Sequence, residues 1–301
     1  MSQLSIDLPE QVSAGMDASF SDSDSKGVCV FASGAASVSA QFAVDASFRS
    51  ELRVVGAMDG RVPGWLTEGT DAVLIHRPGQ DRMSEDVYDA LKDRGCRIHC
   101  IAPESSITDI CRRNGDRLVL TPDRLGGCDS AGFEIGSLSR LFESMGCPSM
   151  RESLEAALPR VMEYRDSLLS DPSPAEELAR RLSGKVVAVY SVAGASAAAM
   201  RWRNSFEEGR SFYGEMTEFD HNEIVGWADP NVHARELELV VLRIGTGAPQ
   251  LEYTIDSMLA VLEEYGRRAT VVRFDDPDMT ASELESMVLG DAVSAFIREG
   301  L

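Results

Sequence analysis

Short apolar runs recur along the chain, and the stretches between them show the spacing of amphipathic helices. In the first half the runs lie at residues 26–31, 52–55, 71–75, 97–101 and 117–120. In the second half they lie at residues 186–190, 237–244 and 269–273. Apolar runs of four to eight residues between helical segments are typical of buried strands in parallel sheets. The pattern therefore predicts an α/β protein with two doubly wound parallel sheets.

Helix signals agree with this alternation. Ser84 is expected to cap a helix that runs to Asp93 and ends before Gly95. A long helix is predicted over residues 250–266, because its apolar residues recur at helical spacing. Residues 132–182 are mostly helical in pattern, with a break at residues 171–174.

These signals divide the chain into four parts. Residues 1–25 end in a polar, acidic stretch and are expected to form a loose lead-in. Residues 26–150 form the first predicted module, residues 151–184 a helical linker, and residues 185–301 the second module.

Composition narrows the range of partners. Of the 301 residues, 44% are hydrophobic and 26% charged, and the formal net charge is −20. Such a surface repels nucleic acid and anionic lipid, so neither is an expected partner. No run of 18 apolar residues exists, and the N-terminus lacks the basic start and apolar core of a signal peptide. We therefore expect a cytoplasmic protein with no membrane partner.

The six cysteines are scattered and form no CxxC pair. They are expected to be reduced and mostly buried thiols. A metal site at Cys96, His99 and Cys100 is disfavoured, because a strand through residues 97–101 places His99 and Cys100 on opposite faces. No metal and no cofactor are predicted.

The stretch at residues 200–230 carries the most specific chemistry. Glu207 and Glu208 precede a second polar cluster, Asp220-His221-Asn222-Glu223, and the chain has only four histidines. A carboxylate and a histidine near one sugar carbon can move a proton along it. The same residues can also be a solvated helix surface and a capped turn, with His221 ordering the turn or contacting another subunit.

This stretch resembles the bifunctional phosphoglucose/phosphomannose isomerases, which are sugar isomerases built from two flavodoxin-like SIS modules. Two further segments resemble the same family, Leu8-Pro9-Glu10-Gln11 and Gly290-Asp291-Ala292-Val293-Ser294. The segments of the main stretch that carry the resemblance are Arg201-Trp202-Arg203-Asn204, Phe212-Tyr213-Gly214-Glu215, Glu218 and His221-Asn222-Glu223-Ile224-Val225-Gly226-Trp227.

The resemblance implies an aldose–ketose isomerase that acts on a sugar phosphate. Glu208 falls on the family's catalytic glutamate, which carries a proton between C1 and C2 through an enediol. His221 falls on the histidine that helps to open the sugar ring, and the family supplies this histidine from the partner subunit of a homodimer. The spacing from Glu208 to His221 is shorter than in the family.

Several family positions are altered. The family's first phosphate-binding serine falls on Ala36, which leaves Ser33, Gly34 and Ser37 as candidate substrate-binding residues. The hydroxyls of the second phosphate loop are replaced by His76, Pro78 and Asp81.

Two further departures concern the catalytic cations. The family's catalytic arginine falls on Cys128. The chain also ends at Leu301 without the final helix that carries the family's lysine. These departures keep open a second hypothesis, a degenerate, non-catalytic SIS protein that binds a sugar phosphate or another carbohydrate derivative in a regulatory or scaffold role.

Three structural alternatives also stay open. The small residues at 33–37 are explained equally by tight strand–helix packing. Arg77 and Arg82 are either surface cations that balance Asp81 and Glu85 or a substitute anion site. Met200, Trp202 and Phe206 recur at helical spacing and are expected in the core rather than against a substrate.

Overall fold

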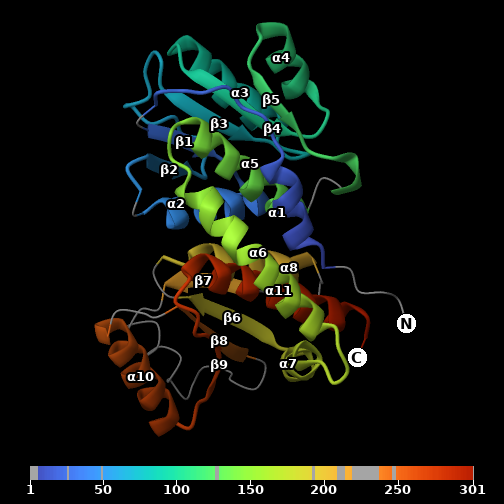
Figure 1. Cartoon of the computed structure of the whole chain (residues 1–301). Helices are drawn as coiled ribbons and strands as arrows, with labels where there is room; N and C mark the ends of the chain where they lie inside the picture. Colours follow the sequence, from blue (N-terminus) through green and yellow to red (C-terminus); the bar gives the residue numbers. More distant parts are fainter. Residues whose placement is uncertain are drawn as a thin grey trace. The chain divides into compact units, whose positions relative to one another are not determined.

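The computed structural model describes residues 6–25, 27–48, 50–125, 129–191, 194–208, 214–218, 237–245 and 249–300. It divides into two compact units (Figure 1). The N-terminal module consists of Asp7–Ala156, and the C-terminal module of Met1–Ile6 with Ala157–Leu301.

The N-terminal module is built on a five-stranded parallel sheet. Its order, β2-β1-β3-β4-β5, is that of flavodoxin-like doubly wound folds, and it confirms the predicted fold class. All five residues of β3 are buried, as expected for a strand covered on both faces. The strands are β1 (Gly27–Phe31), β2 (Arg53–Ala57), β3 (Asp71–Ile75), β4 (Arg97–Ala102) and β5 (Arg117–Leu120).

Helices cover both faces of this sheet. The α3 and α4 helices pack on one face, where Leu74 and Cys100 of the strands meet Leu91 and Cys111 of the helices. The α2 and α5 helices contact each other, and α5 also packs against α1. The helices of this module are α1 (Leu8–Met16), α2 (Ser37–Ser47), α3 (Asp81–Asp93), α4 (Ser106–Asn114), α5 (Ala131–Ser144) and the short η1 (Gly34–Ala36) and η2 (Asp123–Leu125). The next helix, α6 (Ser149–Leu168), begins in this module and continues into the C-terminal one after Ala156.

The expected loose lead-in is wrong for residues 8–16, which form α1. Leu8, Val12 and Met16 recur every four residues and are buried, so this short helix has a continuous apolar stripe. The stripe lies against α5 at a very close crossing: a Cβ on Gly136 would stand 2.1 Å from the Val12 carbonyl oxygen. The polar residues that follow α1 masked this signal in the sequence.

The C-terminal module repeats the plan with four parallel strands in the order β7-β6-β8-β9. Its strands are β6 (Val186–Ser191), β7 (Gly214–Glu218), β8 (Leu237–Ile244) and β9 (Ala269–Phe274). Its helices are α7 (Pro174–Leu182), α8 (Ser196–Glu208), α10 (Pro249–Glu264) and α11 (Met279–Arg298). The predicted strands and the long helix near residues 250–266 are confirmed, whereas β7 was not predicted as a strand.

Ser84 does not cap α3. The helix begins three residues earlier, after Gln80, and the Ser84 hydroxyl lies 2.8 Å from His76 Nδ1 inside the module. The predicted end of the helix is confirmed, because Gly95 adopts a positive φ of 71° and Cys96 N–H bonds the Leu91 carbonyl at 3.1 Å.

Two further expectations are confirmed, one about β4 and one about the cysteines. His99 and Cys100 lie on opposite faces of the strand, since Cys100 joins the core under α3 while His99 Nε2 lies 2.7 Å from Asp71 Oδ1. Free, buried thiols are found at Cys29, Cys96, Cys100 and Cys111.

Candidate functional site

The candidate substrate-binding residues of the N-terminal module lie at the switch point of its sheet. The chain order reverses between the adjacent strands β1 and β3, and ligands of open α/β sheets bind at the carboxyl ends of such strands. Ser33 and Gly34 follow β1, and Ser37 begins α2. Gly34 has a φ of 56° and is exposed, so its backbone is accessible to a ligand. Gln80 reaches this turn by donating a 3.0 Å hydrogen bond to the Ser33 carbonyl.

The turn after β3 is organised by a buried ion pair. Arg77 donates from Nε and Nη2 to the two carboxylate oxygens of Glu134, at 3.0 and 3.1 Å. The Ser39 and Ser130 hydroxyls donate to the same carboxylate at 2.5 and 2.8 Å. Only 4% of Arg77 and 1% of Glu134 are exposed. Arg77 is therefore not a surface cation that balances Asp81 and Glu85, and its bidentate fork serves a carboxylate of the protein itself.

Sequence analysis did not identify Glu134. Its one signal is an acidic residue within a run of small and apolar residues, Ala131-Gly132-Phe133-Glu134-Ile135-Gly136. An acidic residue in such a run must be paired when it is buried. The partner stands 57 positions away in sequence, and only the fold brings the two together.

His76, which the family resemblance aligns with a phosphate-binding hydroxyl, is buried. Burial lowers the pKa of His76, and the nearby carboxylates of Asp81 and Glu85 offset this only in part. The ring therefore favours its neutral form. Its Nε2 has no hydrogen-bond partner among the described residues and lies 3.7 Å from Asp81 Oδ1.

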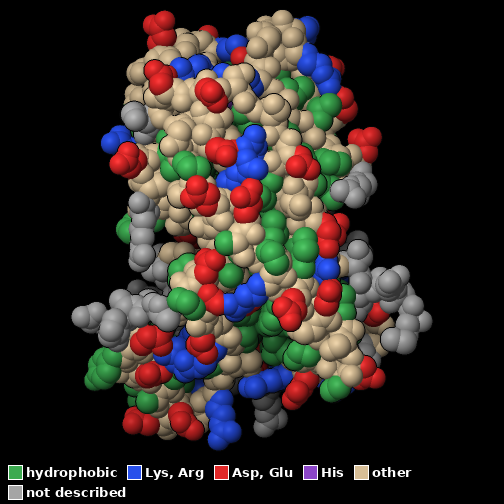
Figure 2. All heavy atoms as spheres, in the orientation of Figure 1, with side chains coloured by type: hydrophobic (Ala, Val, Ile, Leu, Met, Phe, Trp, Pro, Cys, Tyr) green, Lys and Arg blue, Asp and Glu red, His purple; other side chains and the backbone are tan. Residues whose placement is uncertain are grey.

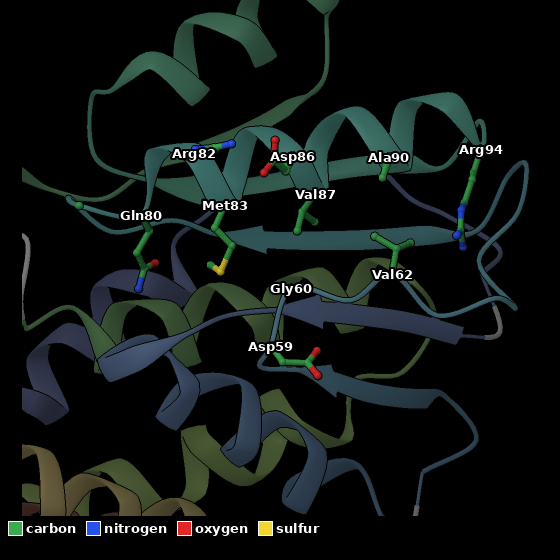
Figure 3. Close-up of a pocket in the computed structure, with 11 residues that line it drawn as sticks. Asp59, Gly60, Val62, Gln80, Arg82, Met83, Asp86, Val87, Ala90 and Arg94 are labelled. Carbon is green, nitrogen blue, oxygen red and sulfur yellow. The ribbon is translucent and has the colours of Figure 1, made fainter.

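A groove of about 700 Å³ runs along α3 from this turn (Figure 3). Met83 and Val87 point into it from the helix, and Val62 faces them from the connection between β2 and β3. Gln80 lies at one end and Arg94 at the other, where Arg94 donates to the Pro63 carbonyl. The full lining is Asp59, Gly60, Val62, Gly79, Gln80, Arg82, Met83, Asp86, Val87, Ala90 and Arg94. Its charges are mixed, so the groove does not select an anion.

Two family-like motifs of the C-terminal module contact each other. Arg201 of α8 makes a bidentate pair with Asp291 of α11, at 2.8 and 2.9 Å. The neighbouring Trp202 is fully buried and donates to the Ser286 carbonyl at 2.7 Å. Its indole fills the notch above Gly290, where a Cβ would stand 2.6 Å from the ring. These motif residues thus hold α8 against α11.

Secondary contacts reinforce this anchor. The Ser205 hydroxyl donates to Asp291 at 2.6 Å, and the Ser294 hydroxyl donates to the Ser205 carbonyl at 2.6 Å. Trp202 and Phe206 form an edge-to-face pair with ring centroids 5.5 Å apart. The expected place in the core is confirmed for Trp202 and Phe206, whereas Met200 is only partly buried.

Glu208 lies at the C-terminal end of this anchored helix. Because α8 connects the parallel strands β6 and β7, it runs antiparallel to them. Its 13 residues span about 20 Å, so its last residue lies towards the amino ends of the strands. Glu208 is therefore remote from the β6–α8 turn of its own module. His221 and Cys128 lie outside the described residues, so the structure does not place the predicted Glu208–His221 pair.

The distribution of charge, possible metal ligands and possible membrane helices was also compared with the expectations from the sequence. Acidic and basic side chains of the described residues are interspersed over the face shown in Figure 2. In the described part of the chain, no cluster of three or more His, Cys, Asp or Glu could hold a metal ion. The helices built from those same residues include none with the length and apolar character to span a bilayer.

Comparison with known proteins points to one family. Residues 171–298 match the family model of the bacterial phospho-glucose isomerase C-terminal SIS domain. The bifunctional phosphoglucose/phosphomannose isomerase of Aquifex aeolicus is 22% identical over 244 residues, which cover 80% of this chain and 73% of that protein. The enzyme of the same name from Caldicellulosiruptor bescii is 21% identical over 203 residues, which cover 64% of this chain and 60% of that protein.

Solved structures share the fold at lower identity. A hypothetical protein of Thermus thermophilus superposes with a TM-score of 0.71 at 14% identity, covering 97% of this chain and 83% of that one. Tagatose-6-phosphate ketose/aldose isomerase of Escherichia coli gives a TM-score of 0.64 at 11% identity, covering 97% and 87%. Together, the family match over residues 171–298 and the two parallel-sheet units make the chain similar to the SIS-domain phosphosugar isomerases, among them the bifunctional phosphoglucose/phosphomannose isomerases.

Proposed function

We propose that the protein interconverts an aldose phosphate and a ketose phosphate, in the manner of phosphoglucose/phosphomannose isomerases. Glu208 serves as the base that moves a proton between C1 and C2 through an enediol. His221, donated by the partner subunit of a homodimer, assists ring opening. The substrate is a sugar phosphate, and no cofactor takes part in the proposed chemistry.

The anchored position of α8 is the observation that carries this proposal. A general base must be held within hydrogen-bond reach of the proton it removes, and small displacements are costly to the rate. The Arg201–Asp291 pair and the Trp202 packing fix the helix that ends at Glu208. The same residues lie inside the segment that matches the phospho-glucose isomerase family model.

A substitution at Glu208 tests the proposal. Glu208→Gln keeps the shape of the side chain but removes its basicity, so the rate should fall by about 10²–10⁴-fold. Glu207→Gln is the matched control, because it removes a neighbouring carboxylate of the same helix, and it should retain nearly full activity. The assay measures fructose 6-phosphate formed from glucose 6-phosphate or mannose 6-phosphate. Equal rates for Glu208→Gln and the parent would remove Glu208 from the chemistry.

One observation favours the alternative of a non-catalytic binding protein. In the N-terminal module, the cation of the turn after β3 is already paired with Glu134. This pairing makes Arg77 unavailable to a ligand phosphate. If the catalytic residues have been altered as well, the protein binds sugar phosphates but does not turn them over. Measurable binding by isothermal titration, together with no turnover of any sugar phosphate by the parent, would support the binding protein over the isomerase.

A further inference from the structure

The Glu134 carboxylate lies in a cradle that is built like an anion site. Its Oε1 accepts from Arg77 Nε at 3.0 Å and from the Ser130 hydroxyl at 2.8 Å. Its Oε2 accepts from Arg77 Nη2 at 3.1 Å and from the Ser39 hydroxyl at 2.5 Å. Each oxygen thus receives one guanidinium N–H and one hydroxyl. This planar, charge-assisted arrangement is the one that arginine offers to carboxylate and phosphate ligands.

The cradle stands where the fold would place a ligand anion. Arg77 follows β3, and Ser39 lies in the first turn of α2, which follows the neighbouring strand β1. These two connections meet at the switch point of the sheet. Glu134 enters from the first turn of α5, and its side chain is 1% exposed. A ligand phosphate that sought Arg77 would have to displace a buried carboxylate or be buried beside it, and two neighbouring buried anions repel strongly.

We propose that Glu134 is a built-in anion, which occupies the anion position of the N-terminal module and prevents Arg77 from binding a ligand phosphate. A phosphosugar is then held by Arg77-independent contacts, at the exposed Gly34 turn or in the C-terminal module. This proposal rests on contacts within the N-terminal module alone, and it stands whether or not the protein isomerises sugars.

Removal of the carboxylate should expose a functional anion site. In Glu134→Ala, the Arg77 fork and the Ser130 hydroxyl lose the carboxylate that accepts from them, while the Ser39 hydroxyl keeps the Ala36 carbonyl at 2.8 Å as an acceptor. A small anion can replace the missing carboxylate. Formate and inorganic phosphate are the probes, added to the full chain at constant ionic strength. At roughly 100 mM formate we expect the unfolding temperature of Glu134→Ala to rise by about 3 °C or more, while that of the parent stays unchanged.

Two control variants isolate the site. The double variant Arg77→Met/Glu134→Ala lacks the cation, so formate should leave its unfolding temperature unchanged. Glu285→Ala removes the acceptor of a similar fork from Arg160, at 2.7 and 3.3 Å, but the Arg160 side chain is 46% exposed and water already solvates it. This variant should not respond either. An equal response in Glu134→Ala and in the double variant, or no response in Glu134→Ala, would overturn the proposal.

A milder substitution covers the case in which Glu134→Ala does not fold. Arg77→Lys keeps the charge beside Glu134 but loses the bidentate fork. Because the proposal excludes Arg77 from phosphate binding, isothermal titration should give the same phosphate affinity in this variant as in the parent, within about twofold. A loss of about fivefold or more would show that Arg77 contacts the ligand and would contradict the proposal.

Discussion

Asp71 is a buried charged residue of the N-terminal module that lies outside the candidate site. It is fully buried at the start of β3, where Arg97 Nη2 donates to it at 2.7 Å and His99 Nε2 lies 2.7 Å from its other oxygen. Burial alone would raise the pKa of Asp71, but the hydrogen bonds from His99 and Arg97 outweigh it and hold that pKa well below its usual range.

This environment predicts a pH-dependent loss of stability. Because the pKa of Asp71 is depressed in the folded state, its contribution is complete above the unfolded value of about 3.9 and is lost as the pH falls towards the folded value. Asp71→Asn should cost about 3 kcal/mol near pH 7, since it removes the buried anion that accepts hydrogen bonds from Arg97 and His99. Urea unfolding from pH 7 to pH 3 should show this difference shrinking below about pH 4.

An exposed aspartate provides the control for this measurement. Asp59 pairs with Arg61 at the surface, where side-chain exposures are 51% and 90%. Asp59→Asn should leave the unfolding curve unchanged near neutral pH, because exposed pairs contribute little. A difference between the parent and Asp71→Asn that does not shrink on acidification would mean that packing, not charge, sets the cost.

At the scale of elements, α1 and α5 cross with their backbones in close contact. A Cβ on Gly136 would stand 2.1 Å from the Val12 carbonyl oxygen and 2.8 Å from the Met16 nitrogen, both backbone atoms. In an isolated helix, Gly→Ala favours folding by about 1 kcal/mol. Here the steric conflict must displace α1 and should outweigh that gain.

We therefore expect Gly136→Ala to destabilise the protein by about 1–3 kcal/mol. Circular dichroism during urea unfolding measures the change. Gly64→Ala is the matched control, because Gly64 has no atom within 4 Å of the added methyl group and should tolerate it. If Gly136→Ala is as stable as the parent, α1 does not pack on α5 through this crossing.

The same elements show where pattern analysis of the sequence succeeds and where it fails. Strands with several consecutive apolar residues, such as β3 and β8, were predicted because burial on both faces requires such runs. The β7 strand contains one apolar residue in Gly-Glu-Met-Thr-Glu, so its sequence lacks that signal. The α1 helix escaped because its apolar stripe spans only nine residues before a long polar stretch.

Only those parts of the candidate site that are formed by residues close together in sequence could be predicted. Ser33, Gly34 and Ser37 were identified from a small-residue turn after a strand, and they lie at the carboxyl edge of the sheet. The pairing of Arg77 with Glu134 depends on the tertiary position of α5, so no local pattern could reveal it. The roles of Glu208 and His221 stay predictions that rest on the family resemblance.

At the scale of the whole molecule, the two modules differ in how far their described residues resemble the phosphoglucose isomerase family. The C-terminal module keeps the motif residues that anchor α8, among them Arg201, Trp202 and Asp291. In the N-terminal module, Arg77 of the turn after β3 is paired with the buried carboxylate of Glu134. The protein is therefore proposed to retain the base for proton transfer while holding the substrate phosphate differently from its relatives.

Proton exchange at the sugar tests this claim most directly. Fructose 6-phosphate is incubated with the protein in heavy water, and deuterium at the carbon next to the carbonyl group is followed by NMR. A base that works through an enediol exchanges its proton with solvent, so the parent and Glu207→Gln should introduce deuterium, while Glu208→Gln should do so about 10²–10⁴-fold more slowly. No deuterium above the protein-free reaction in the parent, or equal rates in the parent and Glu208→Gln, would contradict the proposed isomerase.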